Sequence, residues 1–399
     1  MTMLRSIFAF LLMIFVAGQA SAQTKPERVI MLYIDGLHPD AIDRFELRTL
    51  AAMRTRGASA REGVMPFPAH PTIGAYGDWH TTSFPNVMAL AGTAFLSERP
   101  VYLQHSFVND GITLHAAGSR SYRSLNDGFD YTLTRGNVTD TALVDFYIKT
   151  FEHEGDVLFA RIMLQETGNA GRLQSAQNLS NDPWSQDVFA PNSPYGVALR
   201  NADRQIERLR EFLSSRGELD STLFVLMGDG QSPHGWHLDL DPESARTPIV
   251  FDGPGIRTAT EIDYAETIDV APTIAALMGV RAPNSDGGSG RVLTSLITNG
   301  MSLTHPRPIS RINVQIREHA RLWARAVLAA AEDLAMNVLL MHLKHELLSD
   351  HQFYGPSRVM EWSEAGSLDD MIAANAWVND ALREALDRCV FPFATDKNH

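Results

Sequence analysis

The chain has 399 residues, 44% of them hydrophobic and 20% charged, with a formal net charge of −13. This is the composition of an ordinary globular protein, and the length suits one large α/β domain with an appendage. The negative charge argues against a nucleic-acid-binding surface, because phosphate backbones are held by clustered Lys and Arg. A small phosphate ester remains open as a ligand, since a bound cation can recruit it.

The N-terminus has the pattern of a secretory signal peptide. Arg5 supplies the positive start, Ile7 to Val16 form an apolar stretch, and Ala20-Ser21-Ala22 is a small-x-small cleavage site. The apolar stretch is too short for a stable membrane span. We therefore expect residues 1–22 to be removed and the mature chain to be exported to the periplasm or secreted. An uncleaved anchor is the alternative.

A buried strand is predicted over residues 28–35, because Val29-Ile30-Met31-Leu32-Tyr33-Ile34 is uniformly apolar and leads into Asp35-Gly36. Such a strand places the Asp35 carboxylate at the carboxyl edge of a sheet, where open α/β folds build their sites. An ordinary turn aspartate is the structural alternative. Residues 40–56 are predicted to form the next helix, which Gly57 ends.

Ser83 is the predicted nucleophile. In Ser83-Phe84-Pro85-Asn86, Pro85 suits the first turn of a helix over residues 86–96, so Ser83 would lie just before a helix N-terminus that favours anions. A hydroxyl there can attack phosphorus if a metal lowers its pKa. A simple N-cap role is the alternative for Ser83, and Thr82 is an alternative nucleophile.

The remainder of the first 300 residues alternates between strand and helix patterns. Such alternation predicts an α/β fold with a mainly parallel central sheet and helices on both faces. Residues 97–150 and 173–196 break the pattern and are predicted to be loop or cap insertions over the site. The predicted strands are 157–164, 222–228 and 249–251, and the predicted helices are 198–213 and 269–278.

A second acidic residue, Asp229, follows the strand at 222–228 and begins the segment Asp229-Gly230-Gln231-Ser232-Pro233-His234-Gly235-Trp236-His237. Parallel strands that end at one edge would bring Asp35 and Asp229 together, and such oxygens bind hard divalent cations. His234 and His237 are candidate ligands or contact residues through neutral imidazole, or else solvated loop residues.

The chain changes character after Pro306 and Pro308. Residues 310–348 are predicted to form one long or broken helix, and residues 367–388 a second helix with Ser367 as its N-cap. We interpret residues 301–399 as a helical appendage that serves packing or self-association, and residues 23–300 as the hydrolase-like domain.

Four segments, in chain order, resemble motifs of the alkaline phosphatase superfamily, closest to its type I phosphodiesterase/nucleotide pyrophosphatase branch. They are Ile34-Asp35-Gly36-Leu37-His38-Pro39-Asp40, Ser83-Phe84-Pro85-Asn86, Thr247-Pro248-Ile249-Val250 with Gly253-Pro254-Gly255-Ile256, and Ile268-Asp269-Val270-Ala271-Pro272-Thr273-Ile274 with Leu277-Met278-Gly279. The resemblance covers about residues 28–300. The sulfatase branch is disfavoured, because Val87 stands where its formylglycine signature has Arg.

The resemblance implies two divalent cations, usually zinc, around the phosphoryl group. One would lie between Asp35, Ser83 and Asp229, but the family's His directly after the second Asp is Gly230 here. The second cation's Asp and His fall on Gly168 and Arg172, which leaves only His234 from that set. Glu166 is a candidate replacement oxygen ligand, and Asn109 weakly matches the family's phosphate-contacting Asn.

Arg172 is the other candidate replacement, since a guanidinium binds phosphate oxygens bidentately and supplies a permanent positive charge. Two functions then follow. The first is an exported, metal-dependent hydrolase of phosphate mono- or diesters that acts through Ser83 on a small molecule. The alternative is a non-catalytic ligand-binding protein of the same fold, favoured by the missing ligands.

Overall fold

The computed structural model describes residues 25–65, 102–176, 182–236, 242–283 and 290–298, together with parts of 315–348 and residues 369–388. The predicted helix at 86–96 lies outside these residues.

One eight-stranded sheet forms the centre of the molecule, in the order β4-β3-β5-β1-β6-β7-β2-β8. It is mainly parallel, because only β7 runs antiparallel to its neighbours β6 and β2. The predicted α/β fold class is therefore confirmed. The strands are β1 (Arg28–Ile34), β2 (Ala58–Val64), β3 (Ile112–Ala117), β4 (Tyr131–Thr134), β5 (Val157–Leu164), β6 (Thr222–Gly228), β7 (Val250–Asp252) and β8 (Thr260–Glu266).

Strand β1 lies in the interior of the sheet, between β5 and β6, and is buried along its whole length. Its side chains alternate between two apolar cores: Val29, Met31 and Tyr33 point to one, and Ile30, Leu32 and Ile34 to the other. A strand covered on both faces needs an uninterrupted apolar sequence, which is why the run before Asp35 is uniformly hydrophobic.

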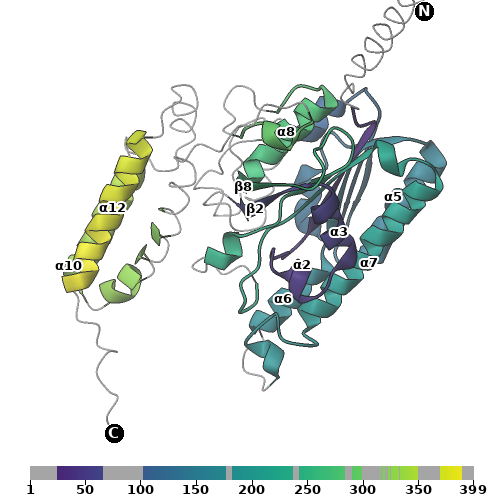
Figure 1. The fold of residues 1–399 in the computed structure, drawn as a ribbon. Coiled ribbons are helices and arrows are strands. Elements are labelled where there is room, and N and C mark those ends of the chain that lie inside the picture. The colour runs from purple at the N-terminus through teal and green to yellow at the C-terminus, as the bar shows by residue number, and fades with distance from the viewer. Residues whose placement is uncertain are drawn as a thin grey trace, which may run out of the picture.

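Helices cover both faces of the sheet, as Figure 1 shows. Helices α2, α3, α5 and α7 contribute to the core on one face, and α8 contributes to the core on the other. Ser193 and Thr139 cap the N-termini of α7 and α5 with their hydroxyls, and Gly279 ends α8 at φ +64°. The helices are α2 (Ala41–Arg44), α3 (Arg48–Arg56), α5 (Asp140–Glu154), α6 (Glu166–Ala176), α7 (Pro194–Ser215) and α8 (Val270–Met278).

Two stretches differ from their predictions. The helix predicted over 40–56 is two helices, because Glu46 takes a left-handed φ of +52° between α2 and α3. The stretch 97–150 was predicted to be a loop or cap insertion, but it contains β3, β4 and α5, which belong to the sheet and its helical layer. In 173–196 the structure describes the end of α6, the short η4 (Pro183–Ser185) and the start of α7.

The C-terminal region contains α10 (Leu334–Leu348) and α12 (Asp369–Arg388). Their inward-facing side chains form an apolar cluster of their own, which includes Met336, Leu343 and Leu382. The helical appendage predicted here is confirmed (Figure 1). Within the described part of the chain, we find no helix with the length and apolar character needed to span a membrane.

Candidate active site

The predicted carboxylates Asp35 and Asp229 lie next to each other at the carboxyl edge of the sheet. Ile34 is in register with Leu164 of β5 on one side and with Gly228 of β6 on the other. The residues that follow these three positions, Gln165, Asp35 and Asp229, therefore leave the sheet side by side. Asp35 is 1% exposed and Asp229 is fully buried. Sequence reasoning anticipated this pair, but it did not anticipate Gln165.

Neutral N–H donors hold both carboxylates. The Gln165 amide nitrogen donates to Asp35 Oδ2, and the Gly36 backbone nitrogen donates to Asp229 Oδ1 at 2.6 Å. Gly36 has a φ of +73°, which suits glycine and lets its N–H point at the neighbouring strand end. The turn after β1 thus connects the two acidic residues directly, and the two side chains are oriented before any ligand binds.

Gln231 brings a third oxygen-bearing side chain to this edge, and sequence reasoning missed it. Its side chain is fully buried, and neither its amide oxygen nor its amide nitrogen has a hydrogen-bond partner among the described residues. The amide packs against backbone: a Cβ at Gly36 would lie 2.8 Å from Oε1, and one at Gly171 would lie 2.6 Å from Nε2. The sequence offered only the proximity to Asp229 as a signal, because burial of this side chain depends on α6.

Two glycines explain why family ligands are missing. A Cβ at Gly168 would lie 2.1 Å from Asp35 Oδ1, so the backbone of α6 rests directly on the Asp35 carboxylate. At Gly230, φ is +72° and a Cβ would lie 2.0 Å from the carbonyl oxygen of Ser244. Neither position has room for the Asp or His that the resemblance would place there. Among the described residues, no group of three His, Cys, Asp or Glu side chains could hold a metal.

Glu166 begins α6 and is held by α5 and α7. Its Oε2 accepts hydrogen bonds from the Asp140 backbone nitrogen at 3.2 Å and from the Asn201 amide at 2.9 Å. Asp140 in turn accepts from the Gln165 nitrogen at 2.8 Å. Burial, followed by repulsion from Glu166, raises the pKa of Asp140 to about 7. A carboxyl group that is partly protonated near neutral pH therefore contacts the Gln165 backbone, close to Asp35.

Arg172 lies on α6, and His234 lies in the loop that follows Asp229. The Arg172 guanidinium is 5.6 Å from the centroid of the Trp236 ring, in the loop that follows Asp229. His234 is exposed, and its Nδ1 is 3.1 Å from the Gln186 carbonyl oxygen. Because a carbonyl only accepts, Nδ1 is the donor in this contact, which leaves Nε2 as the ring nitrogen that could bind a cation. Metal-binding histidines are commonly oriented by this kind of contact.

The remaining predicted site residues do not join this group in the described structure. Ser83 and Thr82 lie outside the described residues, and so does His237. Asn109 is exposed, with a φ of +71°, just before the amino end of β3. Since β3 runs parallel to β1 through β5, Asn109 is at the opposite edge of the sheet from Asp35.

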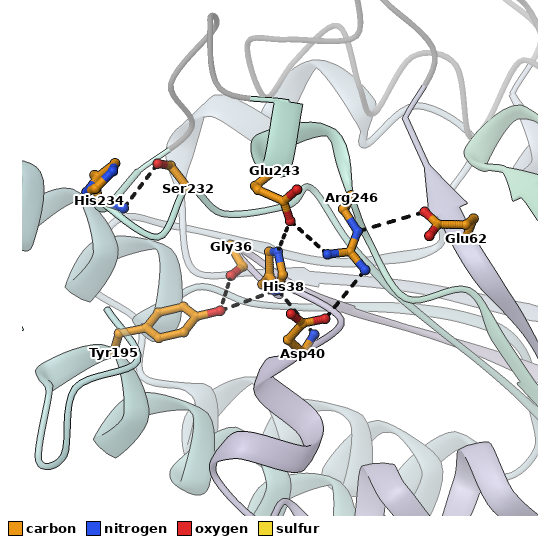
Figure 2. A network of polar contacts seen from close by, with 9 residues as sticks. All are labelled: Gly36, His38, Asp40, Glu62, Tyr195, Ser232, His234, Glu243 and Arg246. Atoms are coloured by element: carbon orange, nitrogen blue, oxygen red, sulfur yellow. Dashed lines mark hydrogen bonds and ion pairs between the residues drawn. The ribbon is translucent and has the colours of Figure 1, made fainter. Parts of the chain in front are cut away.

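A second polar network fixes the turn after Asp35, as Figure 2 shows. The Tyr195 hydroxyl donates to the Gly36 carbonyl at 2.7 Å and accepts from the His38 nitrogen at 3.2 Å. His38 Nδ1 accepts from the Asp40 nitrogen at 3.1 Å, so Nε2 donates to Glu243 at 3.2 Å. Burial is the main cause that lowers the pKa of His38. The ring is thus a neutral link between the turn and η6 (Pro242–Ala245).

Comparisons with known proteins agree with this architecture. No family model matches the chain. Choline-sulfatase from Rhizobium meliloti is 25% identical over 130 residues, which is 31% of this chain and 25% of that protein. The chain therefore spans about a quarter of the length of the curated relative it matches.

Solved structures cover more of the chain. An alkaline phosphatase superfamily protein from Vibrio parahaemolyticus matches with a TM-score of 0.53 and 15% identity, over 71% of this chain and 74% of that one. A phosphonate monoester hydrolase from Silicibacter pomeroyi matches with a TM-score of 0.52 and 18% identity, over 69% and 77%. At these identities the likeness concerns the fold alone. The resemblance to the alkaline phosphatase superfamily is confirmed at that level.

Proposed function

We propose that this chain is a cation-dependent hydrolase that cleaves phosphate esters at the carboxyl edge of β5, β1 and β6. The observation that carries the proposal is the adjacency of Asp35 and Asp229, with Gln231 buried beside them. Two carboxylates and an amide oxygen at the ends of neighbouring parallel strands form the kind of oxygen-rich site that divalent cations need.

The donors favour one hard cation. Asp35, Asp229 and the Gln231 oxygen would hold it, and all three are oxygen ligands, which suit Ca²⁺ or Mg²⁺ better than the zinc expected from the resemblance. The backbone of α6 on Asp35 argues against a second cation. When bound, the cation would supply positive charge that polarises the ester and lowers the pKa of a hydroxyl.

The chain's own residues would do the rest. The Ser83 oxygen would attack phosphorus, the bond from phosphorus to the leaving alcohol would break, and the serine's proton would end on that alcohol. Water would later cleave the bond from phosphorus to the serine oxygen, which restores the hydroxyl and releases phosphate, or a phosphate monoester when the substrate is a diester. Arg172 would bind non-bridging phosphate oxygens through its fork of N–H donors. His234 stays a candidate cation ligand through Nε2. Glu166 is also a candidate oxygen ligand, but it is less available, because the Asn201 amide and the Asp140 backbone nitrogen already bond one of its two oxygens.

Sulfate esters are the second candidate substrate class. The local similarity to a choline-sulfatase favours them, and so does the fold shared with a protein solved with D-glucosamine-2-N,6-O-disulfate, with a TM-score of 0.52 and 14% identity over 71% of this chain. A non-catalytic binding protein is the third possibility, favoured by Gly168 and Gly230. Export of the mature chain from about Gln23 completes the proposal; N-terminal sequencing of the protein from the periplasm or medium tests it.

Turnover assays separate these functions. The EDTA-treated mature protein would be given bis-p-nitrophenyl phosphate, p-nitrophenyl phosphate and p-nitrophenyl sulfate, each with Ca²⁺, Mg²⁺, Mn²⁺ or Zn²⁺. We expect cation-dependent phosphate-ester hydrolysis, lost by about 100-fold or more in Ser83→Ala and Asp229→Asn and kept in the exposed control Asp263→Asn. Faster sulfate cleavage would favour the second class. Cation binding with no turnover on any substrate would overturn the hydrolase proposal.

Gln231→Leu tests the cation site by the sign of two effects. Without cation, the variant should be as stable as the wild type or more stable, since it removes a buried amide with no partner among the described residues. With cation, it should gain less thermal stability and bind about tenfold or more weakly. A cation-induced shift in melting temperature equal to that of the wild type would remove Gln231 from the site.

A further inference from the structure

A cavity lies at the edge of the sheet opposite Asp35. Its volume is about 230 Å³, and it opens where α3 ends, β6 begins and β7 ends. A water molecule occupies about 30 Å³ in the liquid, so the space is large enough for a small ion and its hydration. The polar and backbone groups that line it include Arg56, Gly57, Arg210, Thr222, Asp252 and Gly253.

Two guanidinium groups in this cavity share one carboxylate. Arg56 Nε and Arg210 Nη1 each donate to Asp252 at 2.9 Å, and Arg56 Nη2 donates to it as well. Asp252 is 4% exposed, and the Arg210 side chain is 12% exposed. Asp252 therefore balances only one of the two guanidinium charges, and Asp220, which also lines the cavity, supplies the second negative charge. Burial is the main reason that the pKa of Arg210 is lowered, so Asp252 does not fully compensate this cation.

Arg210 also has donors to spare. A guanidinium carries five N–H donors, and Arg210 makes one hydrogen bond to the described residues, while its guanidinium lies 4.6 Å from the centroid of the Phe224 ring. A planar guanidinium held against an aromatic ring keeps its edges available to bind oxyanions in a bidentate manner. Arg210 is therefore held in place by Asp252 and Phe224, so its remaining N–H donors have a fixed orientation, unlike those of a freely moving surface arginine.

The walls of the cavity leave no room for side chains at two positions. A Cβ at Gly57 would lie 2.1 Å from the Phe251 carbonyl oxygen, and one at Gly253 would lie 2.4 Å from the Thr222 carbonyl oxygen.

Asp220 places a negative charge at the same cavity. It is an exposed residue of η5 (Leu219–Ser221) that lines the cavity and contributes to raising the pKa of Arg56. An anion in the cavity would be attracted by two arginines and repelled by Asp220 and by Asp252, whose carboxylate both guanidinium groups already bind.

We propose that this cavity is a binding site for a small oxyanion of the phosphate or sulfate type, separate from the carboxyl edge and held by Arg56 and Arg210. The proposal does not rest on the hydrolase function. If the chain does hydrolyse such esters, the released oxyanion is a ligand of the right class for this second site.

Inorganic phosphate is the probe, titrated calorimetrically into the full chain with EDTA at constant low ionic strength. We expect saturable binding that weakens about tenfold or more in Arg56→Gln and tightens several-fold in Asp220→Asn, because one change removes a charged donor and the other removes a repelling charge. Arg54→Gln is the matched control: Arg54 is on the same helix, pairs with Asp43 and does not line the cavity.

The Asp35→Asn, Asp229→Asn double variant separates the two sites, since it alters the carboxyl edge and leaves the cavity intact. Binding kept in the double variant and lost in Arg56→Gln supports the proposal. Three results overturn it: no saturable binding, equal binding in Arg56→Gln and Arg54→Gln, or loss of binding in the double variant. Arg56 and Asp220 are exposed residues, so a check of melting temperature establishes that their variants fold.

Discussion

Asp140 connects the stability of the protein to pH. Its pKa of about 7 in the fold is well above its ordinary value of 3.8, so folding takes up a proton between these two pH values. The stability that this group contributes is complete below pH 3.8 and is lost as pH rises through 7. Its Oδ1 accepts backbone hydrogen bonds from Gln165 and Glu166, a role that an asparagine carbonyl can also fill.

Asp140→Asn should therefore remove a pH dependence and keep the local structure. We expect the variant to gain stability over the wild type as pH rises from about 4 to 7, by on the order of a few kcal/mol at the end of that range. Urea unfolding at intervals of pH measures the difference, with the exposed Asp263→Asn as control. A constant difference between wild type and Asp140→Asn across this range would contradict the shifted pKa.

Gly230 and Gly217 form a natural pair for testing why the family's histidine is absent. Their φ angles are +72° and +74°, but a Cβ at Gly230 would lie 2.0 Å from the Ser244 carbonyl oxygen, whereas a Cβ at Gly217 meets nothing within 4 Å. Alanine at Gly217 should cost about 1 kcal/mol of unfolding free energy from backbone strain. At Gly230 it should cost at least about 2 kcal/mol more. Equal losses in chemical denaturation would show that Ser244 moves aside easily.

At the scale of elements, α7 holds the turn that follows β1. Tyr195, near the start of α7, bonds both Gly36 and His38 through its hydroxyl and is fully buried. Tyr195→Phe should cost about 1–3 kcal/mol of stability, because it leaves two buried backbone groups unpaired. If the proposed cation site is correct, cation affinity should fall as well, since this turn orients Asp229.

Tyr147→Phe is the matched control for that measurement. Tyr147 is equally buried, on α5, but its hydroxyl has no hydrogen-bond partner among the described residues. Removing this hydroxyl should be neutral or slightly stabilising. Thermal melts of both variants decide the matter: a Tyr195→Phe protein as stable as Tyr147→Phe would mean that the turn does not depend on α7.

The elements that were predicted well are those whose sequence carries one dominant signal. β5 and β6 have the predicted bounds, because short, mostly apolar runs are typical of strands buried on both faces; Arg161 is the charged residue within β5. β3 was missed because Thr113 and His115 make it look polar, although both side chains are buried and hydrogen-bonded within the fold. Partners remote in sequence satisfy these groups, and a local pattern cannot reveal them.

The candidate site was predictable to the same extent. Asp35 and Asp229 are marked by the strands they follow, so their proximity could be expected from parallel pairing. The roles of Gln165 and Gln231 depend on where α6 packs, and the loss of room at Gly168 and Gly230 depends on contacts with Asp35 and Ser244. Those contacts are tertiary, and only the folded chain discloses them.

At the scale of the whole molecule, the C-terminal helices present apolar side chains on two faces. Leu334, Val338 and Met341 on α10 are 80%, 58% and 69% exposed, while Leu343 on the same helix is buried in the C-terminal cluster. An exposed apolar face on a helix whose other face is already buried commonly marks a surface where a partner packs. This is consistent with self-association through the C-terminal region, which stays a prediction.

Sedimentation velocity tests that prediction. The full chain should sediment as a dimer or larger assembly, and Leu334→Glu with Met341→Glu should shift it toward the monomer without changing its melting temperature by more than a few degrees. Val197→Glu, at a 55% exposed apolar residue of α7, is the control. A wild-type chain that is monomeric at micromolar concentration would refute self-association through this surface.

The position of β1 in the sheet has a consequence for how the molecule is made. Its hydrogen-bonding neighbours are Val157–Leu164 and Thr222–Gly228, so this buried apolar strand leaves the ribosome long before either partner is made. Until then the nascent chain exposes a hydrophobic segment without its partner strands, which favours aggregation. We therefore expect slow folding, and shielding of Val29–Ile34 by chaperones during synthesis, from this strand order.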